Sequence, residues 1–465
     1  MANRFRMSEA SMGDPPCEAT RNSTGHHLTR WLAAWALLVA ASFAFGGILR
    51  GLGVLPIDHL PPLHAHFRVL TITLLPAAAF GVAAVRVLPG VVARLNFGAA
   101  LAAAYACALA WTVLLAVSGD GLAAPFTHKE EYLAVLPVVG DDPSRWLAAF
   151  TRDLPAYPTH VRGHPPLPVL VLWALNATGL SGPLWAALLV VVVGCSAAVA
   201  IALTVRRLSG EDAARHALPY LALAPASVWI ATSMDALFAG VGAWGVALLV
   251  CGRDGWRRLA CGMVAGVLLG ALPYLSYGLV PYLLIPAAVA VVVRLPRLTI
   301  VAVLAGAAAV TAAFASAGFL WPAGALATHA QWAADPGAAR PYLYFLVADL
   351  AALALVSGPA TTAGLTQGIP YGVRITVLAT LAAVLALDVS GVTRGEVERI
   401  WIPYTLWIGL AASFAEGPGG GRAGARRRRA AAGRQDRPPF TSDHRWLASQ
   451  MVTGLLLQGL IASPW

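Results

Sequence analysis

Long apolar segments separated by short polar connections run through most of the chain. They cover residues 31–49, 69–88, 97–117, 183–205, 217–232, 235–251, 259–276, 279–293, 298–318, 343–357, 372–389, 400–413 and 447–463. A helix that crosses the hydrocarbon core of a bilayer needs about 20 mainly apolar residues. The pattern predicts an all-α polytopic membrane protein with about 13 transmembrane helices, and no separate soluble domain.

One long polar stretch, from Asp120 to Pro166, interrupts this pattern. It holds six of the 22 acidic residues: Asp120, Glu130, Glu131, Asp141, Asp142 and Asp153. A loop of this length between membrane helices is usually functional or a linker. Its own patterning argues against a linker, so we expect residues 118–166 to form a functional outer loop.

The middle of this loop has the pattern of a short amphipathic helix. Asp142 is a suitable N-cap and Pro143 suits the first helical position. One face would carry Trp146, Leu147, Phe150 and Leu154, and the other Arg145, Arg152 and Asp153. We expect this helix to lie in the membrane interface with its aromatic face in lipid.

Basic residues at the ends of apolar segments predict the topology. Arg21 and Arg30 place the N-terminus inside, so three spans place the Asp120–Pro166 loop outside. The apolar run Leu167–Leu180 is about 21 Å long as a helix, which is short for a core of about 30 Å. If it does not cross, the later basic clusters all fall inside: Arg206-Arg207, Arg257-Arg258, Arg294 with Arg297, and Arg426 to Arg429.

The same topology brings further polar segments to the outer face. They are Ser233-Met234-Asp235, the Trp321–Pro341 loop, and Gly395-Glu396-Val397-Glu398-Arg399. We therefore expect the residues that carry chemistry to converge on one side of a multi-pass cell-membrane protein.

Composition agrees with a multi-pass membrane protein, and it indicates the character of the segments outside the membrane. The chain is 58% hydrophobic and 12% charged, with a mean hydropathy of +0.70. The net charge of +10 does not indicate nucleic-acid binding, because the basic residues sit mostly at the ends of apolar segments. Around the transmembrane domain, 31–415, we expect a disordered cytoplasmic N-terminus (1–30), an Arg/Gly-rich cytoplasmic linker (416–443) and a C-terminal transmembrane helix (444–465).

Glu130 and Glu131 are the candidates for a general base. A carboxylate near an apolar surface has a raised pKa, and the neighbouring Lys129 opposes that rise. The alternative is a solvated acidic turn. Two adjacent carboxylates do not hold a divalent cation without further ligands.

His160, Arg162 and His164 alternate, so in an extended segment they would share one face. Such a cationic strip suits a phosphate group. The alternative is a turn that ends the loop at Pro165-Pro166. A zinc site is less favoured, because no third ligand of the usual kind lies nearby.

Four other positions have both structural and functional interpretations. Asp235 suits a helix cap at the outer face. Asp349 falls within an apolar run, where an acidic residue is costly and therefore a functional candidate. The alternative is that its helix begins later. Glu398 and Arg399 precede a span and could instead be an interfacial anchor.

Together these motifs resemble the GT-C superfamily of integral-membrane glycosyltransferases, which use polyprenyl-phosphate sugars. Within it, the chain looks most like the actinobacterial methylthioxylose transferase group. The stretches that carry the resemblance are Glu130-Glu131-Tyr132-Leu133, His160-Val161-Arg162-Gly163-His164-Pro165-Pro166, Thr232-Ser233-Met234-Asp235-Ala236-Leu237-Phe238, Ser276-Tyr277-Gly278 and Gly395-Glu396-Val397-Glu398-Arg399-Ile400-Trp401. Two features depart from the pattern: Leu167 follows the two prolines in place of glycine, and the 416–443 insertion is foreign to it.

The resemblance implies transfer of a sugar from a polyprenyl-phosphate donor to a hydroxyl of a cell-envelope glycan at the outer face. Glu131, with Glu130 as the alternate, would take the acceptor proton. The donor phosphate would be bound by His160, Arg162, His164 and Arg399, and the substrate-site candidates are Tyr132, Lys129, Asp235, Glu396 and Glu398. The resemblance leaves room for a divalent cation without requiring one.

Two other classes of protein remain open. A transporter or lipid-linked-sugar flippase would explain the many spans and Asp349, but it predicts inverted repeats and paired broken helices that the sequence does not display. A non-catalytic envelope-assembly protein would be indifferent to replacement of Glu131.

Overall fold

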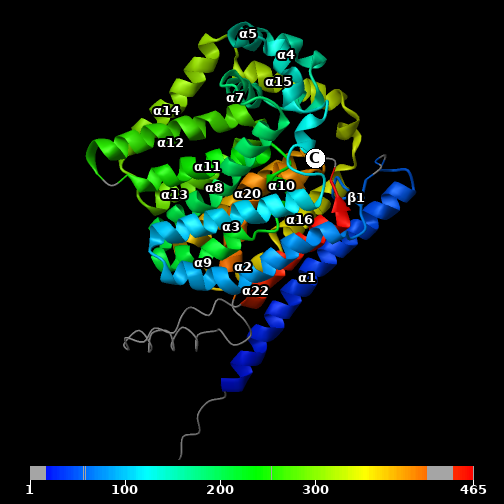
Figure 1. The fold of residues 1–465 in the computed structure, drawn as a ribbon, viewed down its shortest axis with the longest axis vertical. Coiled ribbons are helices and arrows are strands. Elements are labelled where there is room, and N and C mark those ends of the chain that lie inside the picture. The colour runs from blue at the N-terminus through cyan, green and yellow to red at the C-terminus, as the bar shows by residue number, and fades with distance from the viewer. Residues whose placement is uncertain (1–16, 56, 58, 253, 416–443, 464–465) are drawn as a thin grey trace, which may run out of the picture.

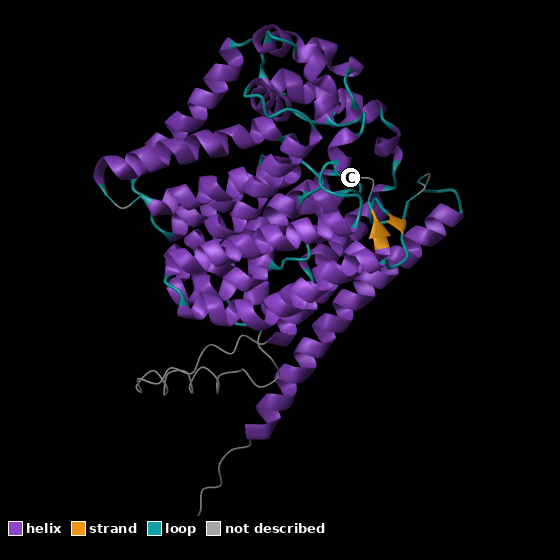
Figure 2. Cartoon of the chain, viewed as in Figure 1, coloured by secondary structure: helices purple, strands orange, loops and turns teal. Residues whose placement is uncertain are grey.

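The computed structural model describes residues 17–55, 57, 59–252, 254–415 and 444–463, and these are almost entirely helical (Figures 1 and 2). The helices of more than one turn are α1 (Cys17–Gly51), α2 (Leu75–Arg94), α3 (Phe97–Ser118), α5 (Pro143–Asp153), α7 (Leu167–Ala177), α8 (Pro183–Ser209), α9 (Glu211–Ala222), α11 (Asp235–Cys251), α12 (Gly255–Leu275), α13 (Leu284–Val292), α14 (Arg297–Ser316), α15 (Trp321–Ala334), α16 (Tyr342–Ser357), α17 (Pro359–Leu365), α18 (Tyr371–Ser390), α20 (Ile402–Ile408) and α22 (His444–Leu460).

Short turns and one small ribbon connect these helices. The single-turn helices are α4 (Leu136–Val139), α6 (Thr159–Arg162), α10 (Ser227–Ile230) and α19 (Val397–Ile400). The 3-10 turns are η1 (Ile72–Leu74), η2 (Ala124–Thr127), η3 (Tyr132–Val135), η4 (Leu154–Ala156), η5 (Tyr277–Leu279), η6 (Pro281–Leu283), η7 (Pro336–Ala339) and η8 (Gly409–Phe414). Strands β1 (His66–Phe67) and β2 (Ile461–Ala462) pair antiparallel.

The described helices include seven that are long and apolar enough to cross a membrane. They are the part of α1 from His26 to Gly51, η1 with α2, α3, α8, α12, α14 and α18. Helices α16 and α17 meet at a bend of 98° and make an eighth if they are one span. Shorter apolar helices cover Leu167–Ala177, Asp235–Cys251, Tyr277–Val292 and Ile402–Phe414. The protein is therefore a multi-pass membrane protein by helix length and composition, whereas the expected count of about 13 spans is not confirmed.

Two expected boundaries changed or could not be tested. Helix α1 begins at Cys17, inside the segment expected to be disordered, because no proline or glycine pair follows Pro15-Pro16 before the apolar run. The expected linker 416–443 lies outside the described residues. The run after Pro166 forms only the 11-residue helix α7, as its length predicts.

Small residues allow the apolar helices to pack closely. A Cβ atom on Gly266 of α12 would lie 2.0 Å from the carbonyl oxygen of Val303 on α14. A Cβ atom on Gly240 of α11 would lie 2.3 Å from the carbonyl oxygen of Val193 on α8. Backbones that approach this closely gain van der Waals contact, which is a main source of helix association in a membrane.

Arginines of α8 and α9 mark one end of the bundle. At one end the Arg206 guanidinium lies 4.3 Å from the centre of the Phe97 ring, and Arg215 donates to the Leu95 carbonyl at 2.9 Å. Arg206-Arg207 therefore lies beside the α2–α3 connection. Since α3 begins at this end and leads to the Asp120–Pro166 loop, that loop lies at the other end. This is the arrangement expected if the run after Pro166 does not cross.

The opposite end gathers the polar connections, as expected. Thr73 donates to the Ser118 carbonyl at 2.8 Å, so the connection before α2 meets the end of α3. The amide of His64 donates to Glu398, and Arg399 reaches Asp235. The β1–β2 ribbon, at the right of Figure 1, closes this end.

Helix α5 forms as the sequence predicts, but its aromatic face is not in lipid. Asp142 accepts a hydrogen bond from the Arg145 amide at 2.9 Å, and Pro143 opens the helix. Trp146 and Phe150 are 5% and 0% exposed. The Phe150 ring lies 5.8 Å from that of Phe319 in the α14–α15 connection. The expected lipid contact is wrong because this connection covers the face with protein.

Candidate active site

A buried carboxylate–imidazole pair lies at the polar end of the bundle. Glu131 Oε1 and His160 Nδ1 are 2.8 Å apart, and the two side chains are 4% and 7% exposed. Glu131 immediately precedes η3, and His160 lies in α6. Burial raises the pKa of Glu131, but the hydrogen bond and charge of His160 and the charge of Arg399 outweigh it, so the net shift is downward. Glu131 is therefore ionised at neutral pH.

Glu130 has a different role from its neighbour. Its Oε2 accepts hydrogen bonds from the amide and the hydroxyl of Thr159, at 2.9 and 2.8 Å. They give the backbone N–H of Thr159, the first residue of α6, a hydrogen-bond acceptor, and they lower the pKa of Glu130. Its carbonyl also accepts from the His160 amide at 3.3 Å. Glu130 thus positions His160 against Glu131.

The expected extended strip of His160, Arg162 and His164 is wrong. Residues Thr159–Arg162 form a helical turn, which a carboxylate 29 positions earlier stabilises. Arg162 is half-buried and lies 3.4 Å from the Thr159 hydroxyl instead of beside His160. Lys129 is exposed, and its charge acts on Glu130.

His164 and Tyr132 pack around the pair. The Tyr132 ring lies 6.1 Å from that of His160 and 5.7 Å from that of His164. His164 Nδ1 lies 2.8 Å from the His160 carbonyl oxygen. Burial lowers the pKa of His164 to about 4, so this imidazole is neutral at physiological pH. The single N–H of the neutral ring is used at the His160 carbonyl, so His164 neither donates a hydrogen bond to a phosphate nor neutralises its charge.

Arg399 is buried between two carboxylates. Its Nη1 lies 3.4 Å from Asp235 Oδ2 and its Nη2 lies 3.1 Å from Glu396 Oε2. Burial alone lowers the pKa of Arg399, but the charges of Asp235, Glu396 and Glu131 outweigh it and raise the pKa. The guanidinium therefore remains charged in the interior.

Asp235 is not the helix cap that its position suggests. Met234 occupies the N-cap position of α11, and no side chain caps the helix. Asp235 is 3% exposed and accepts a hydrogen bond from the Ser233 hydroxyl at 3.1 Å. The cap interpretation is wrong because a buried arginine requires a carboxylate partner, and Asp235 supplies it to Arg399.

Glu396 connects Arg399 to the connection between α1 and α2. Its Oε1 lies 3.3 Å from His64 Nδ1 and 3.8 Å from Arg340 Nη1. Glu396 has a φ of +65°, a left-handed conformation that costs roughly 1–3 kcal/mol for a residue other than glycine. That conformation lets one carboxylate contact Arg399 and His64 together.

Glu398 and Asp349 accept hydrogen bonds from the two backbone segments that meet at Glu396. Burial raises the pKa of Glu398 to about 7, although its Oε1 accepts the His64 amide at 2.8 Å. Asp349 is fully buried and accepts the Gly395 amide at 3.1 Å. Asp349 is an acidic residue in an apolar run, which is costly. Through its hydrogen bond to Gly395 it helps to position the neighbouring Glu396.

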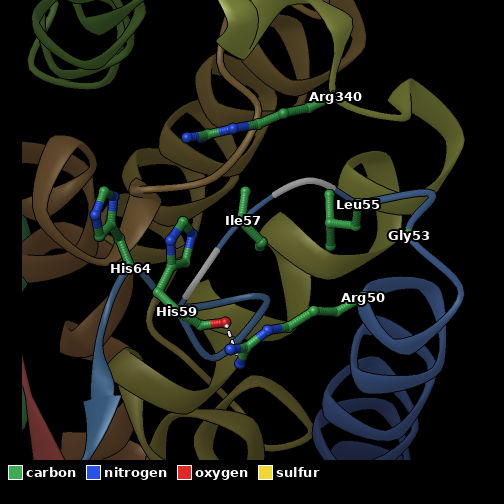
Figure 3. A pocket seen from close by; sticks show the side chains of 7 residues that line it. All are labelled: Arg50, Gly53, Leu55, Ile57, His59, His64 and Arg340. Carbon is green, nitrogen blue, oxygen red and sulfur yellow. Dashed lines mark hydrogen bonds between the residues drawn. The ribbon is translucent and has the colours of Figure 1, made fainter.

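The sequence analysis did not single out four basic residues at this end. Arg50, His59, His64 and Arg340 line a cavity of about 660 Å³ (Figure 3). Three histidines within eight residues, His59 to His66, between the first two apolar segments are the signal that could have found it. Arg340 gives no such signal, because only the fold brings it to this connection.

The described residues contain no group of three or more His, Cys, Asp or Glu side chains arranged to hold a metal ion. What they provide is an ionised buried carboxylate, an imidazole in contact with it, and a buried cation nearby. Such a set can accept a proton and stabilise a developing negative charge.

Comparisons with known proteins find similarity at the level of structure. No protein-family model matches the chain, and no curated protein matches it. ArnT from Cupriavidus metallidurans in the apo state has a TM-score of 0.36 at 17% identity, over 61% of this chain and 58% of that one. The chain thus covers little more than half of that protein. ArnT bound to undecaprenyl phosphate gives 0.40 at 16% identity, over 70% of each chain. These values do not assign the chain to a family.

Proposed function

We propose that the protein is a membrane glycosyltransferase that moves a sugar from a polyprenyl phosphate to a hydroxyl of a cell-envelope glycan. The buried Glu131–His160 pair beside Arg399 is the observation that carries the proposal. The resemblance of the surrounding motifs to GT-C glycosyltransferases supports the same reaction.

In the proposed reaction the acceptor oxygen attacks the anomeric carbon of the donor. A glycosidic C–O bond forms, the bond from that carbon to the phosphate oxygen breaks, and the lipid phosphate leaves with the bonding electrons. Glu131 takes the acceptor proton directly or through His160, since the two share a contact of 2.8 Å.

The leaving phosphate needs positive charge. Arg399 is a permanent cation at the cluster, and His160 becomes one when it is protonated. His164 would donate a hydrogen bond to the phosphate from Nε2 only when it is protonated, since Nδ1 faces the His160 carbonyl and a pKa of about 4 leaves the ring neutral. Arg162 would act from the rim. Asp235 and Glu396 hold the Arg399 guanidinium in position, and Tyr132, Lys129 and Glu398 remain candidates for substrate contact.

The finer assignments remain proposals. We propose that the polar end of the bundle faces outward, because Arg206-Arg207 lies at the other end and basic clusters favour the cytoplasmic side. We propose a methylthioxylose-type sugar or another pentose or hexose, on the basis of the sequence resemblance.

The first experiment compares cell-envelope glycans from a deletion strain complemented with wild type or with Glu131→Gln. Glutamine keeps the shape and cannot take a proton. A sugar substituent should vanish in the deletion and return with wild type. With Glu131→Gln it should fall at least about a hundredfold, the usual contribution of a general base.

Asp153→Asn is the matched control, because Asp153 is an exposed carboxylate of the same loop. It should restore the glycan fully at equal membrane expression. Full restoration by Glu131→Gln would refute the base assignment and favour the transporter or assembly-protein alternatives. Loss of the sugar substituent with Glu130→Gln but not with Glu131→Gln would identify Glu130 as the general base.

A further inference from the structure

His64, in the connection between α1 and α2, contacts two glutamates of the segment that carries Arg399. Its backbone amide donates to Glu398 Oε1 at 2.8 Å, and its Nδ1 atom lies 3.3 Å from Glu396 Oε1. Glu398 follows His64 by 334 positions, so only the fold brings the two together. The backbone contact fixes where the connection lies, and the side-chain contact fixes one oxygen of Glu396.

Neighbouring elements hold the His64 imidazole in place. Its ring stacks on that of His59, with the ring centres 4.1 Å apart and the planes 6° from parallel (Figure 3). Two residues after His64 the chain forms β1, which pairs with β2, and the Arg68 amide then donates to the Leu460 carbonyl at 2.8 Å. The imidazole therefore has a fixed position relative to Glu396.

The Glu396 carboxylate links His64 to Arg399, because each of its oxygens faces a different partner. Oε1 lies 3.3 Å from His64 Nδ1, and Oε2 lies 3.1 Å from Arg399 Nη2. Burial raises the pKa of Glu396, but the hydrogen bond of His64 and the charges of His64, Arg399 and Arg340 outweigh it, so the net shift is downward. Glu396 is therefore an ionised carboxylate held between two donors.

Without the imidazole, Glu396 would lose the partner of one oxygen. In the described part of the chain, Oε1 would be left with Arg340 Nη1 at 3.8 Å, which is beyond hydrogen-bonding distance. Glu396 also has a φ of +65°, and a residue other than glycine keeps such a conformation only where its surroundings hold it. Asp349 holds the backbone through the Gly395 amide, at 3.1 Å, whereas His64 holds the side chain. Loss of the imidazole should therefore let the carboxylate turn.

The direction of the Glu396 carboxylate matters for Arg399. The guanidinium contacts Asp235 Oδ2 at 3.4 Å on one side and Glu396 Oε2 at 3.1 Å on the other. From this position its charge lowers the pKa of Glu131, the partner of His160. A guanidinium that follows a displaced Glu396 would move relative to that pair. Misplacement of a reacting or stabilising group by about 1 Å can cost on the order of 100-fold in rate.

We propose that His64 is a positioning residue of the candidate active site, which holds the Arg399 guanidinium through Glu396 at the place where the leaving phosphate gains negative charge. The inference rests on the proposed function, since the position of Arg399 matters to the reaction only if the phosphate leaves beside it. His64 takes no part in bond making or proton transfer. Its contribution is a hydrogen-bond donor at the Nδ1 position, which distinguishes it from a histidine that only fills space.

The test expresses full-length variants in the deletion strain and measures the sugar substituent of the envelope glycan at equal membrane expression. His64→Leu removes the donor and keeps a side chain of similar size, so the substituent should fall about ten- to a hundredfold. His64→Asn keeps an N–H on a nitrogen bonded to Cγ, as Nδ1 is, and should stay within about threefold of wild type, since the charge-assisted hydrogen bond is kept. His66→Leu is the matched control, because His66 is an exposed histidine of the same connection, and it should stay within about twofold.

A double substitution tests whether His64 and Glu396 act together. The melting temperature of the purified protein in detergent would be measured for His64→Leu, Glu396→Gln and the double variant. The two decreases should be less than additive, because each substitution breaks the same contact. Additive decreases would show that His64 does not act through Glu396, and they would overturn the proposal.

The glycan measurements separate this inference from the proposed function. Full restoration by His64→Leu, beside a loss with Glu131→Gln, would refute the positioning role and leave the proposed function standing. Equal losses with His64→Leu and His64→Asn would also overturn the positioning role, because the donor at Nδ1 would then not matter. If the deletion strain loses no sugar substituent, the proposed function fails and this inference falls with it.

Discussion

Two buried glutamates of the candidate site have pKa values shifted in opposite directions. Glu131 has a protonatable partner in His160 and a cation nearby in Arg399, so its pKa is lowered despite burial. Glu398 has backbone amides as its hydrogen-bond partners, and burial raises its pKa to about 7. The difference arises from the partners, because both side chains are almost fully buried.

This contrast predicts opposite effects of pH on stability. A glutamate with a lowered pKa stabilises the fold above its unfolded value, about 4.3, and loses that contribution as the pH falls through its folded pKa. Glu131→Gln should therefore have a lower melting temperature than wild type at pH 6 and above. The difference should shrink on acidification below about pH 4.

For Glu398 the sign reverses. Its protonated form is favoured in the fold, so its contribution is complete below about pH 4.3 and is lost as the pH rises through about 7. The shift from 4.5 to about 7 corresponds to about 3 kcal/mol. Glu398→Gln should match wild type near pH 4 and melt above it near pH 8.5. Parallel melting curves for the two variants across this range would contradict both pKa assignments.

Single residues of the candidate site could be picked out from the sequence only as candidates. The acidic pair in the long loop belongs to the candidate site, but the different contacts of Glu130 and Glu131 depend on Thr159 and His160, some 30 positions later. Arg340 could not be predicted, because it shares Glu396 with His64 only through the contact of α1 with α16. Local patterns cannot report contacts of that kind.

At the scale of elements, α5 could be read from the sequence because its signals are local. A cap, a proline at the first turn and a 3.6-residue apolar period all lie within 13 residues. The α6 turn lacked such signals, since the Glu130 carboxylate stabilises it from outside. The local pattern also could not predict that the α14–α15 connection covers the apolar face of α5.

The cap of α5 makes a prediction of its own. Asp142→Ala removes the hydrogen bond to the Arg145 amide and should cost about 1 kcal/mol. If α5 opens locally, amide hydrogen exchange across Pro143–Asp153 should become about fivefold faster. Asp141→Ala is the control, since Asp141 is an exposed neighbour without this bond. Equal exchange in the two variants would show that packing on Phe319, not the cap, sets the stability of α5.

At the scale of the whole molecule, the polar end depends on the helices behind it. Helix α14 packs against α12 and leads to Phe319, whose ring contacts Phe150 of α5. A Cβ atom on Gly318 would lie 2.9 Å from Ala148 of α5, so this approach is also close. The spacing of two membrane helices thus sets the position of the loop that carries Glu131.

Gly266→Ala should therefore affect more than its own helix. Its new Cβ atom would lie 2.0 Å from the Val303 carbonyl oxygen, and backbone cannot move aside as a side chain can. Overpacking of this kind costs typically 1–3 kcal/mol. We expect a lower melting temperature in detergent and faster hydrogen exchange in α5 as α14 moves away from α12.

Gly47→Ala is the matched control, because a Cβ atom on Gly47 of α1 would meet nothing within 4 Å. Alanine there should leave the protein as stable or stabilise it by up to about 1 kcal/mol, through its greater helix propensity. A lower melting temperature for Gly266→Ala with unchanged exchange in α5 would separate helix packing from the catalytic loop. Faster exchange in α5 would instead show that the α12–α14 contact holds Glu131 and His160 in place from within the membrane.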